Sequence, residues 1–274
     1  MKSRILLLLF KPISILLVFI VLFICSCTAP MEMLYIPNSN NVPLLKEKDE
    51  FKGTIMPANF QTAFSFTNHI GFMVNGEDNN WLSALEQDHS TITSDHRYDE
   101  HWRCKLIEAG AGYFTSQNQN EVYEIYGGTG YGEMTTTGNL YLNADVKMNY
   151  YKTFIQPAIG FSNDYLDFAF SLRTSYVYFF NYTHTGLTSS NSILDTSISS
   201  FQPHQYNSYL FEPAFTLKVG HKYVKFHTQL GLSIPTTRIS DNQRSEHLTV
   251  NYWGFNANLG ITVNIASRFK SQKL

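Results

Sequence analysis

One short segment concentrates the side chains that could bind a metal ion. Residues 88–102 hold three histidines and four carboxylates: His89, His96, His101, Asp88, Asp95, Asp99 and Glu100. Imidazole and carboxylate groups together can coordinate a divalent cation. Their spacing matches no zinc motif such as HExxH, in which two histidines share one face of a helix. We therefore expect a solvated loop without a metal or cofactor, in which His89, His96 and His101 are candidate ligands at most.

Motifs for other chemistry are incomplete. The glycine-rich stretch 127–133, "GGTGYGE", follows an alternating segment, but no helical pattern opens after it, so a phosphate or dinucleotide site is not expected. Serine and histidine occur together in the late polar stretches, but no spacing pairs a nucleophile with a base and a carboxylate. The sequence therefore favours a protein that is not an enzyme, with a hydrolase as the least favoured alternative.

Charged side chains recur at alternate positions of long apolar segments. In residues 165–180, "YLDFAFSLRTSYVYFF", aromatic and aliphatic residues fall on one side, and Asp167 and Arg173 fall on the other. A period of two indicates a β-strand, and this one is far longer than the ~5–6 residues usual in soluble domains. The charged side of several such segments comprises Lys152, Asp167, Arg173, Glu212, Lys218, Lys225 and His227. If the apolar side faces lipid, these seven residues form a charge cluster in an enclosed lumen, where they either cross-link and fill the interior or line a pore.

Ten segments of this kind follow one another. We place them at 50–57, 60–66, 70–76, 103–114, 121–130, 150–162, 165–180, 207–219, 222–234 and 249–265. Connections near 67–69, 115–120, 163–164 and 220–221 are short, whereas those near 76–102, 131–149, 181–206 and 235–248 are long and polar. Such alternation is typical of outer-membrane barrels, which have tight periplasmic turns and longer external loops. The pattern predicts an all-β, antiparallel up-and-down transmembrane β-barrel.

Two alternatives to this architecture stay open. The first three strands are short, and the link at 57–60 is tight where a long loop is expected, so eight strands with a plug or a periplasmic segment would also fit. A soluble β-sandwich with one wet and one dry face would show the same alternation.

A repeat links two of the predicted hairpins. The stretches 154–170 and 210–226 share a pattern in which Pro157 and Pro213 take the same position. Because proline removes a ladder hydrogen bond, we expect a local bulge at each.

The N-terminus reads as an export signal. Lys2, Arg4 and Lys11 are basic, and residues 13–25 form an apolar run. The run ends in "ICSC" at 24–27, which resembles the lipobox of bacterial lipoproteins. The resemblance implies cleavage before Cys27 and lipidation of that cysteine. Ordinary cleavage without a lipid, or an uncleaved transmembrane anchor, are the alternatives.

The bulk composition narrows the class of partner. The net charge is -2 and aromatic residues make up 15% of the chain. A general nucleic-acid binder would be basic, so no nucleic-acid partner is expected. Tyrosine and tryptophan favour the membrane–water boundary, which points to a lipid bilayer as the partner.

Four stretches carry a likeness to a known family: "CTAPMEMLYIPNSNNVPLL" (27–45), "FSFTNHIGFMVNG" (64–76), "FIQPAIGF" (154–161) and "FAFSLRTSYV" (168–177). In these stretches the chain resembles small, mostly uncharacterised outer-membrane β-barrel proteins of the Bacteroidota, often predicted lipoproteins. No catalytic motif accompanies the likeness.

We expect a signal peptide at 1–26, a periplasmic tether at 27–49 and a barrel at 50–274. An even strand count places both termini on the periplasmic side of the outer membrane. The expected role is structural or surface recognition through the long external loops, with an unidentified external ligand. A narrow pore for ions or small solutes is the alternative.

Overall fold

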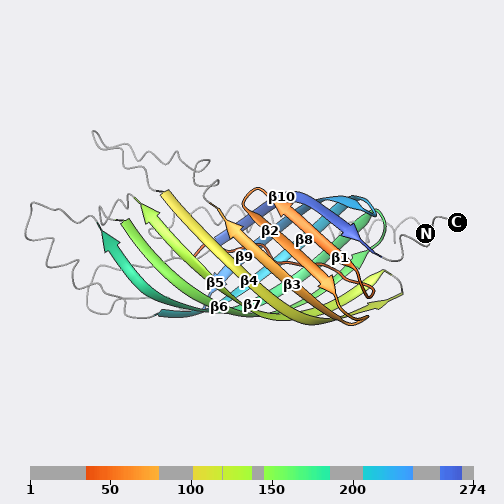
Figure 1. The fold of residues 1–274 in the computed structure, drawn as a ribbon, viewed down its shortest axis with the longest axis horizontal. Helices are drawn as coiled ribbons and strands as arrows, with labels where there is room; N and C mark the ends of the chain where they lie inside the picture. The colour runs from red at the N-terminus through yellow and green to blue at the C-terminus, as the bar shows by residue number, and fades with distance from the viewer. Residues whose placement is uncertain are drawn as a thin grey trace, which may run out of the picture.

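The protein is an all-β barrel. The computed structural model describes residues 35–79, 101–118, 120–137, 145–185, 206–236 and 254–266. Ten antiparallel strands, joined in sequence order, close into one barrel (Figure 1). They are β1 (Phe51–Met56), β2 (Asn59–Ser65), β3 (Ile70–Asp78), β4 (His101–Gln117), β5 (Glu121–Thr137), β6 (Asp145–Ser162), β7 (Leu166–Thr185), β8 (Tyr206–His221), β9 (Val224–Pro235) and β10 (Gly254–Ile265). The predicted fold class is confirmed, with ten strands rather than eight. In the described part of the chain, no helix is long and apolar enough to cross a membrane.

Side-chain alternation places the apolar residues on the outside of the barrel. On β7, Phe168 and Phe170 are exposed, whereas Asp167 and Arg173 are buried in the interior. This is the reverse of a soluble domain, in which large apolar side chains are the ones removed from water. The same inversion runs through β4 to β9, so the barrel has an apolar outer wall and a polar lumen.

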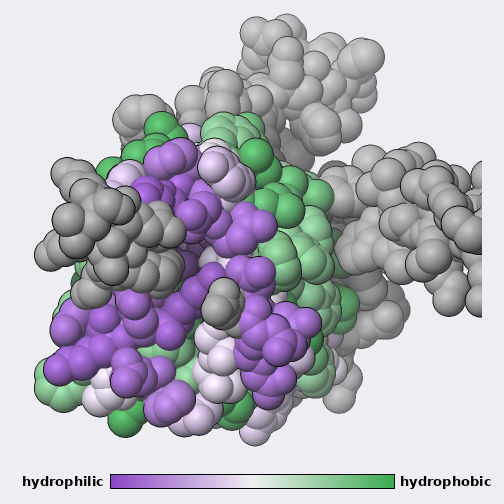
Figure 2. Space-filling view, turned by 90° about the vertical axis from the view of Figure 1, so that its right-hand side faces the viewer, coloured by the Kyte–Doolittle hydropathy of each residue, from purple (hydrophilic) through white to green (hydrophobic). Residues whose placement is uncertain are grey.

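The two ends of the barrel differ. Short turns at 66–69, 118–120, 163–165 and 222–223 lie at one end, which we call the turn end. The strands that leave toward 80–100, 138–144, 186–205 and 237–253 reach the other end, which we call the loop end; these four segments lie outside the described residues. In Figure 1 the turn end is on the right, and Figure 2 looks onto it, with hydrophilic residues gathered over the end and hydrophobic residues on the flank.

Local chemistry accounts for the tightness of the turns. Between β6 and β7, the side-chain oxygen of Asn163 accepts hydrogen bonds from the backbone N–H groups of Tyr165 and Leu166, at 2.8 and 2.7 Å. An asparagine side chain that bonds the backbone just after it closes a turn of this kind. β10 then ends where β1 begins, with Ile265 opposite Phe51, so the ring closes at the turn end.

The strands at the loop end extend further than the sequence indicated. β5 continues to Thr137 and β6 starts at Asp145, so the connection expected at 131–149 shortens to 138–144. The opposite holds for β1 and β2, which have 6 and 7 residues and turn back at 57–58. Because β1 is so short, β10 pairs with it only near the turn end. The pairing runs toward the loop end as far as Ile55 opposite Ile261.

The bulges expected at Pro157 and Pro213 are wrong. Pairing between β6 and β7 is interrupted beside Pro157, and pairing between β8 and β9 is interrupted beside Pro213. The register is the same before and after each interruption, so no residue is inserted. Each proline lacks the N–H that would bond the strand on one side. Pairing with the strand on the other side continues without a break, between β5 and β6 at Pro157 and between β7 and β8 at Pro213.

The interpretation of 27–49 as a tether outside the barrel is wrong for residues 35–45. Residues 35–45 run through the barrel interior, and all of them except Ile36 are buried. A barrel of about eight strands is just filled by its own side chains, and a wider one leaves space along its axis. Here the chain itself fills that space. We call Tyr35–Leu45 the lumen segment; residues 27–34 lie outside the described residues.

Candidate functional site

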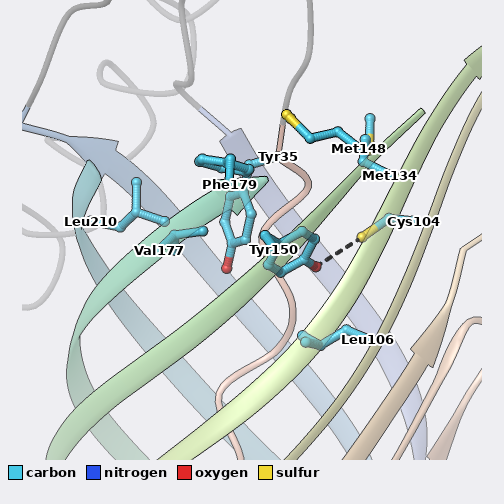
Figure 3. Close-up of a cluster of buried hydrophobic side chains, with 9 residues drawn as sticks. All are labelled: Tyr35, Cys104, Leu106, Met134, Met148, Tyr150, Val177, Phe179 and Leu210. Carbon is cyan, nitrogen blue, oxygen red and sulfur yellow. Dashed lines mark hydrogen bonds between the residues drawn. The ribbon is translucent and has the colours of Figure 1, made fainter. Parts of the chain in front are cut away.

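The barrel interior, with the lumen segment in it, is where the polar side chains converge. At the loop end, Tyr35 packs into a cluster with Cys104, Leu106, Met134, Met148, Tyr150, Val177, Phe179 and Leu210 (Figure 3). The Tyr35 and Tyr150 rings meet edge to face, with centroids 5.7 Å apart. Cys104, the one cysteine among the described residues, is free, and its Sγ lies 3.3 Å from the Tyr150 hydroxyl. This cluster is a small apolar core that holds the start of the lumen segment.

On the turn-end side of this cluster, Lys152 and Glu212 form an ion pair, and the Tyr35 hydroxyl is hydrogen-bonded to both. Lys152 Nζ donates to that hydroxyl at 2.6 Å and lies 3.2 Å from Glu212 Oε2. The Tyr35 hydroxyl in turn donates to Glu212 Oε1 at 3.0 Å. Both charges are removed from water, so each must be paired and hydrogen-bonded to be tolerated. The Tyr35 hydroxyl supplies one of these hydrogen bonds to each of the two charged groups.

Arg173 ties the lumen segment to the wall over several contacts. Its guanidinium donates to the Asn38 side-chain oxygen at 3.0 Å and to the Ser39 carbonyl at 3.1 Å. It also lies 3.3 Å from Glu108 Oε1, which accepts a further bond from Asn38 Nδ2 at 2.9 Å. The planar fork of arginine suits this set of acceptors in a way that an ammonium group would not. Arg173 and Glu108 together therefore clamp Asn38.

In the middle of the barrel, wall side chains take the place of a neighbouring strand. Asn40 N donates to Gln229 Oε1, and Gln229 Nε2 donates to the Asn40 carbonyl, both at 2.8 Å. Asn40 Nδ2 bonds the Glu212 carbonyl at 2.9 Å, beside Pro213, where β8 and β9 do not pair. The Asn41 carbonyl accepts from Gln156 Nε2 at 2.7 Å. Wall side chains thus satisfy the buried Asn40 N–H and the Asn40 and Asn41 carbonyls, which have no strand partner.

Nearer the turn end the partners are charged. Leu44 N donates to Glu124 Oε2 at 2.9 Å, and the Leu44 carbonyl accepts from Lys52 Nζ at 2.8 Å. Lys218 Nζ donates to the Val42 carbonyl at 2.8 Å. These contacts fix the segment just before the chain turns into β1.

The structure places all seven residues of the predicted lumen cluster inside the barrel, but in separate groups. Lys152, Arg173 and Glu212 gather around Asn38, whereas Lys225 pairs with Asp167 at 2.7 Å nearer the turn end. Lys218 bonds the lumen segment, as described above. His227 is buried, and its Nδ1 lies 3.3 Å from the Thr262 hydroxyl.

Four buried charged residues were missed from sequence: Glu50, Lys52, Glu108 and Glu124. Glu108 carried a usable signal, because it stands opposite Ile107 and Ala109 in an alternating segment. The contribution of the lumen segment itself had no such signal, since residues 35–45 have no period.

The candidate metal ligands are not brought into this site. His89 and His96 lie outside the described residues, and of His101 only the backbone, at the start of β4, is described. Within the described ranges, no group of three or more His, Cys, Asp or Glu side chains is placed to hold a metal ion.

The outer wall carries two rings of aromatic side chains. The loop-side girdle consists of Tyr131, Tyr151, Tyr176, Tyr178, Phe180 and Tyr209, several of which are in ring contact. The turn-side girdle consists of Tyr113, Tyr123, Tyr165 and Tyr223. On β5, Tyr123 and Tyr131 are separated by about 20 Å along the axis, at ~3.3 Å per residue and ~40° tilt.

Charge on the outer wall is confined to positions beyond these girdles. At the loop end, Glu133 pairs with Lys147 at 2.8 Å and Asp78 with Arg103 at 2.7 Å. Between the girdles, no outward-facing position of the ten described strands carries Asp, Glu, Lys or Arg. The wall is therefore an apolar band bounded by aromatic rings.

No protein-family model matches the chain, and no curated protein matches it significantly.

Proposed function

We propose that the protein is an outer-membrane β-barrel lipoprotein, related to the small Bacteroidota barrels that it resembles, with a non-catalytic structural or surface-recognition role. Its signal peptide would end before Cys27, which would carry the lipid. Its long connections at the loop end would face the outside and meet an external ligand.

The apolar band between the two girdles supports the membrane location. Outer-membrane barrels have an outward apolar band about 25 Å tall, flanked by aromatic girdles at both interfaces. The band here is of similar height and is free of charge. A soluble protein would rarely expose so continuous an apolar surface.

The filled interior supports a role other than conduction. The lumen segment occupies the axis from the level of Tyr35 to that of Leu45, and wall side chains bond it throughout. Among the described residues, one small cavity lies beside it, lined by Pro37, Asn40, Pro213, Gly231 and neighbours. A path for ions would require this segment to move, so a narrow pore is the less favoured function.

Fractionation and gel mobility test the location and the closed barrel together. After expression in a Gram-negative host, the protein should appear in the outer membrane, and its mobility on an SDS gel should differ between unheated and boiled samples. A soluble, monomeric protein in the absence of detergent would contradict the proposal.

Planar-bilayer recording tests the filled interior. The intact protein should give no steady conductance. The matched variant is Asn38→Gly with Asn40→Gly, which removes side-chain contacts to Glu108 and Ser171 while leaving the wall unchanged. It should give occasional openings. Steady conductance from the intact protein would favour the pore.

A further inference from the structure

We propose that β10 presents an open strand edge that binds an extended segment of another polypeptide by β-strand addition. The edge consists of residues 257–259, beyond the point where β1 ends, and we call it the open edge. The proposal rests on the proposed membrane location, because there the edge is out of reach of water. It assigns a class of partner to a defined part of the wall.

Antiparallel pairing makes the residues of β10 bond its two neighbours in turn. Asn264 N donates to the Tyr223 carbonyl at 2.8 Å, so the even-numbered residues of β10 exchange hydrogen bonds with β9. The odd-numbered residues direct their N–H and C=O groups to the other side. There, Ile261 stands opposite Ile55, the last residue of β1 that pairs with β10.

Ala257 and Leu259 continue this odd-numbered row beyond the end of β1. β1 ends at Met56 and the chain turns back at 57–58 into β2, so no described strand lies beside them on this side. Their N–H and C=O groups make no hydrogen bond with any described residue. The short β1 and β2, orange in Figure 1, therefore leave a break in the wall at the loop-end half of the barrel.

The opposite rim of the break, formed by β3 and β4, is capped. Asp78 N donates to the Ala58 carbonyl at 2.9 Å. Asn79 then bonds β4 twice, since its N–H donates to the Cys104 carbonyl at 3.1 Å and its side-chain oxygen accepts from Cys104 N at 2.7 Å. At this level the backbone of β3 and β4 is satisfied, whereas that of the open edge is not.

The open edge lies within the apolar band. Asn264 is bonded to Tyr223 of the turn-side girdle, and Leu259 and Ala257 lie further along β10 toward the loop end. Their heights above that girdle are about 13 and 18 Å, at ~3.3 Å per residue and ~40° tilt. Lipid offers no partner to backbone groups at this depth. An extended peptide supplies donors and acceptors at the spacing of a strand, which an acyl chain does not.

The two faces of the break specify the side chains of the partner. On the inner face, Asn258 Nδ2 donates to the Ser39 hydroxyl at 2.6 Å, and Gln61 Nε2 donates to the Ser39 carbonyl at 3.0 Å. On the outer face, Ile55 and Leu259 are exposed. The partner is therefore a segment whose polar residues face the lumen segment and whose alternate, apolar residues face lipid.

A second copy of the chain fits the open edge less well than a separate extended segment. Strands of an upright barrel are tilted by ~40°, so the facing walls of two neighbouring barrels cross at about 80°. Strand addition requires the two backbones to run side by side. An unattached extended segment can adopt that direction, whereas a strand fixed in a second barrel cannot.

Photocrosslinking of a peptide to the intact protein in micelles tests the proposal. The probe has the sequence of β9 (Val224–Pro235), which has the required alternation, with a benzoyl group on the Phe226 ring. Its crosslinks, mapped by mass spectrometry, should concentrate on the open edge and on residues 55–60. The same peptide with its alternate amide nitrogens methylated is the control for backbone pairing, and it should crosslink about tenfold less.

A proline substitution tests the edge from the side of the protein. Ala257→Pro removes a donor from the open edge and leaves the ladder with β9, which uses the even-numbered residues. The variant should keep the heat-dependent gel shift of the barrel and crosslink the peptide about tenfold less. Asn258→Pro removes a donor to β9 and should weaken the barrel itself.

Three results would overturn the proposal. The first is crosslinking spread evenly over the outer wall, or unchanged by methylation of the peptide, and this comparison decides the matter even if Ala257→Pro does not fold. The second is absence of any crosslink to the parent protein, because the chain would then cover its own edge. The third is a crosslinked dimer formed without peptide by Leu259→p-benzoylphenylalanine, because the occupant would then be a second copy. The membrane location fails separately, if the protein is monomeric and soluble without detergent.

Discussion

The side-chain amide of Gln229 binds both backbone groups of Asn40, with its oxygen accepting from the Asn40 N–H and its nitrogen donating to the Asn40 carbonyl, each at 2.8 Å. Gln229, a residue of the barrel wall, thereby makes the two backbone hydrogen bonds that a neighbouring strand would make. The lumen segment has no regular structure of its own, so its position depends on such contacts.

Replacing Gln229 with alanine should loosen this contact. The Asn40 N–H and carbonyl would be left buried without these partners, at a cost of about 2–5 kcal/mol in the free energy of unfolding. Denaturant unfolding in detergent micelles measures it. The outward neighbour Thr228→Ala is the control and should change stability by about 0.5 kcal/mol or less. Equal effects from the two substitutions would argue against the contact.

Arg173 should be needed for the charge balance around Asn38. Arg173→Met leaves Glu108 without its arginine partner and should lower stability by about 3–5 kcal/mol. Arg173→Lys keeps the charge but cannot reach the same acceptors, so its loss should be intermediate.

A double-variant cycle makes this prediction specific. Glu108→Gln combined with Arg173→Met should cost clearly less than the sum of the two single changes, because the unpaired charge is then absent. Strict additivity would mean that the two residues do not act together.

The free-energy cost of a charged substitution on the apolar outer band should depend on its depth in the bilayer. Ile155 lies between the girdles and is half exposed, so Ile155→Arg should destabilise the barrel in lipid by about 2–4 kcal/mol. Tyr165→Arg, in a turn at the edge of the band, should cost about 0–1 kcal/mol. Folding into vesicles against urea measures both, and a larger loss for Tyr165→Arg would refute the assignment of the band.

Lipidation should be separable from barrel formation. Cys27→Ala should abolish incorporation of radiolabelled palmitate, while the heat-dependent gel shift remains, since none of the ten described strands includes Cys27. Continued incorporation would place the lipid elsewhere or exclude the lipobox assignment.

The strands were predictable because period-two alternation is a local property of the chain. It located all ten strands and assigned Asp167, Arg173, Glu212 and the other lumen charges to the inner face. The strand ends were predicted less accurately. Near the loop end the strands extend past the apolar band, and the polar residues there, such as those around Thr137 and Asp145, give the same sequence pattern as a loop.

The lumen segment was not predictable in the same way. Its hydrogen-bond partners come from all ten strands, including Glu108 of β4, Arg173 of β7 and Gln229 of β9, and they meet only when the ring has closed. The split of the lumen charges into separate groups also depends on strand tilt and stagger, which the alternation does not specify.

The most direct test of the filled barrel is amide hydrogen exchange of residues 35–45 in the intact protein in micelles. The Asn40 and Leu44 amides donate to Gln229 and Glu124 in the buried interior, so they should exchange as slowly as the amides of the strands. Exchange within seconds at these amides, alongside protected strands, would show that the lumen segment does not occupy the barrel.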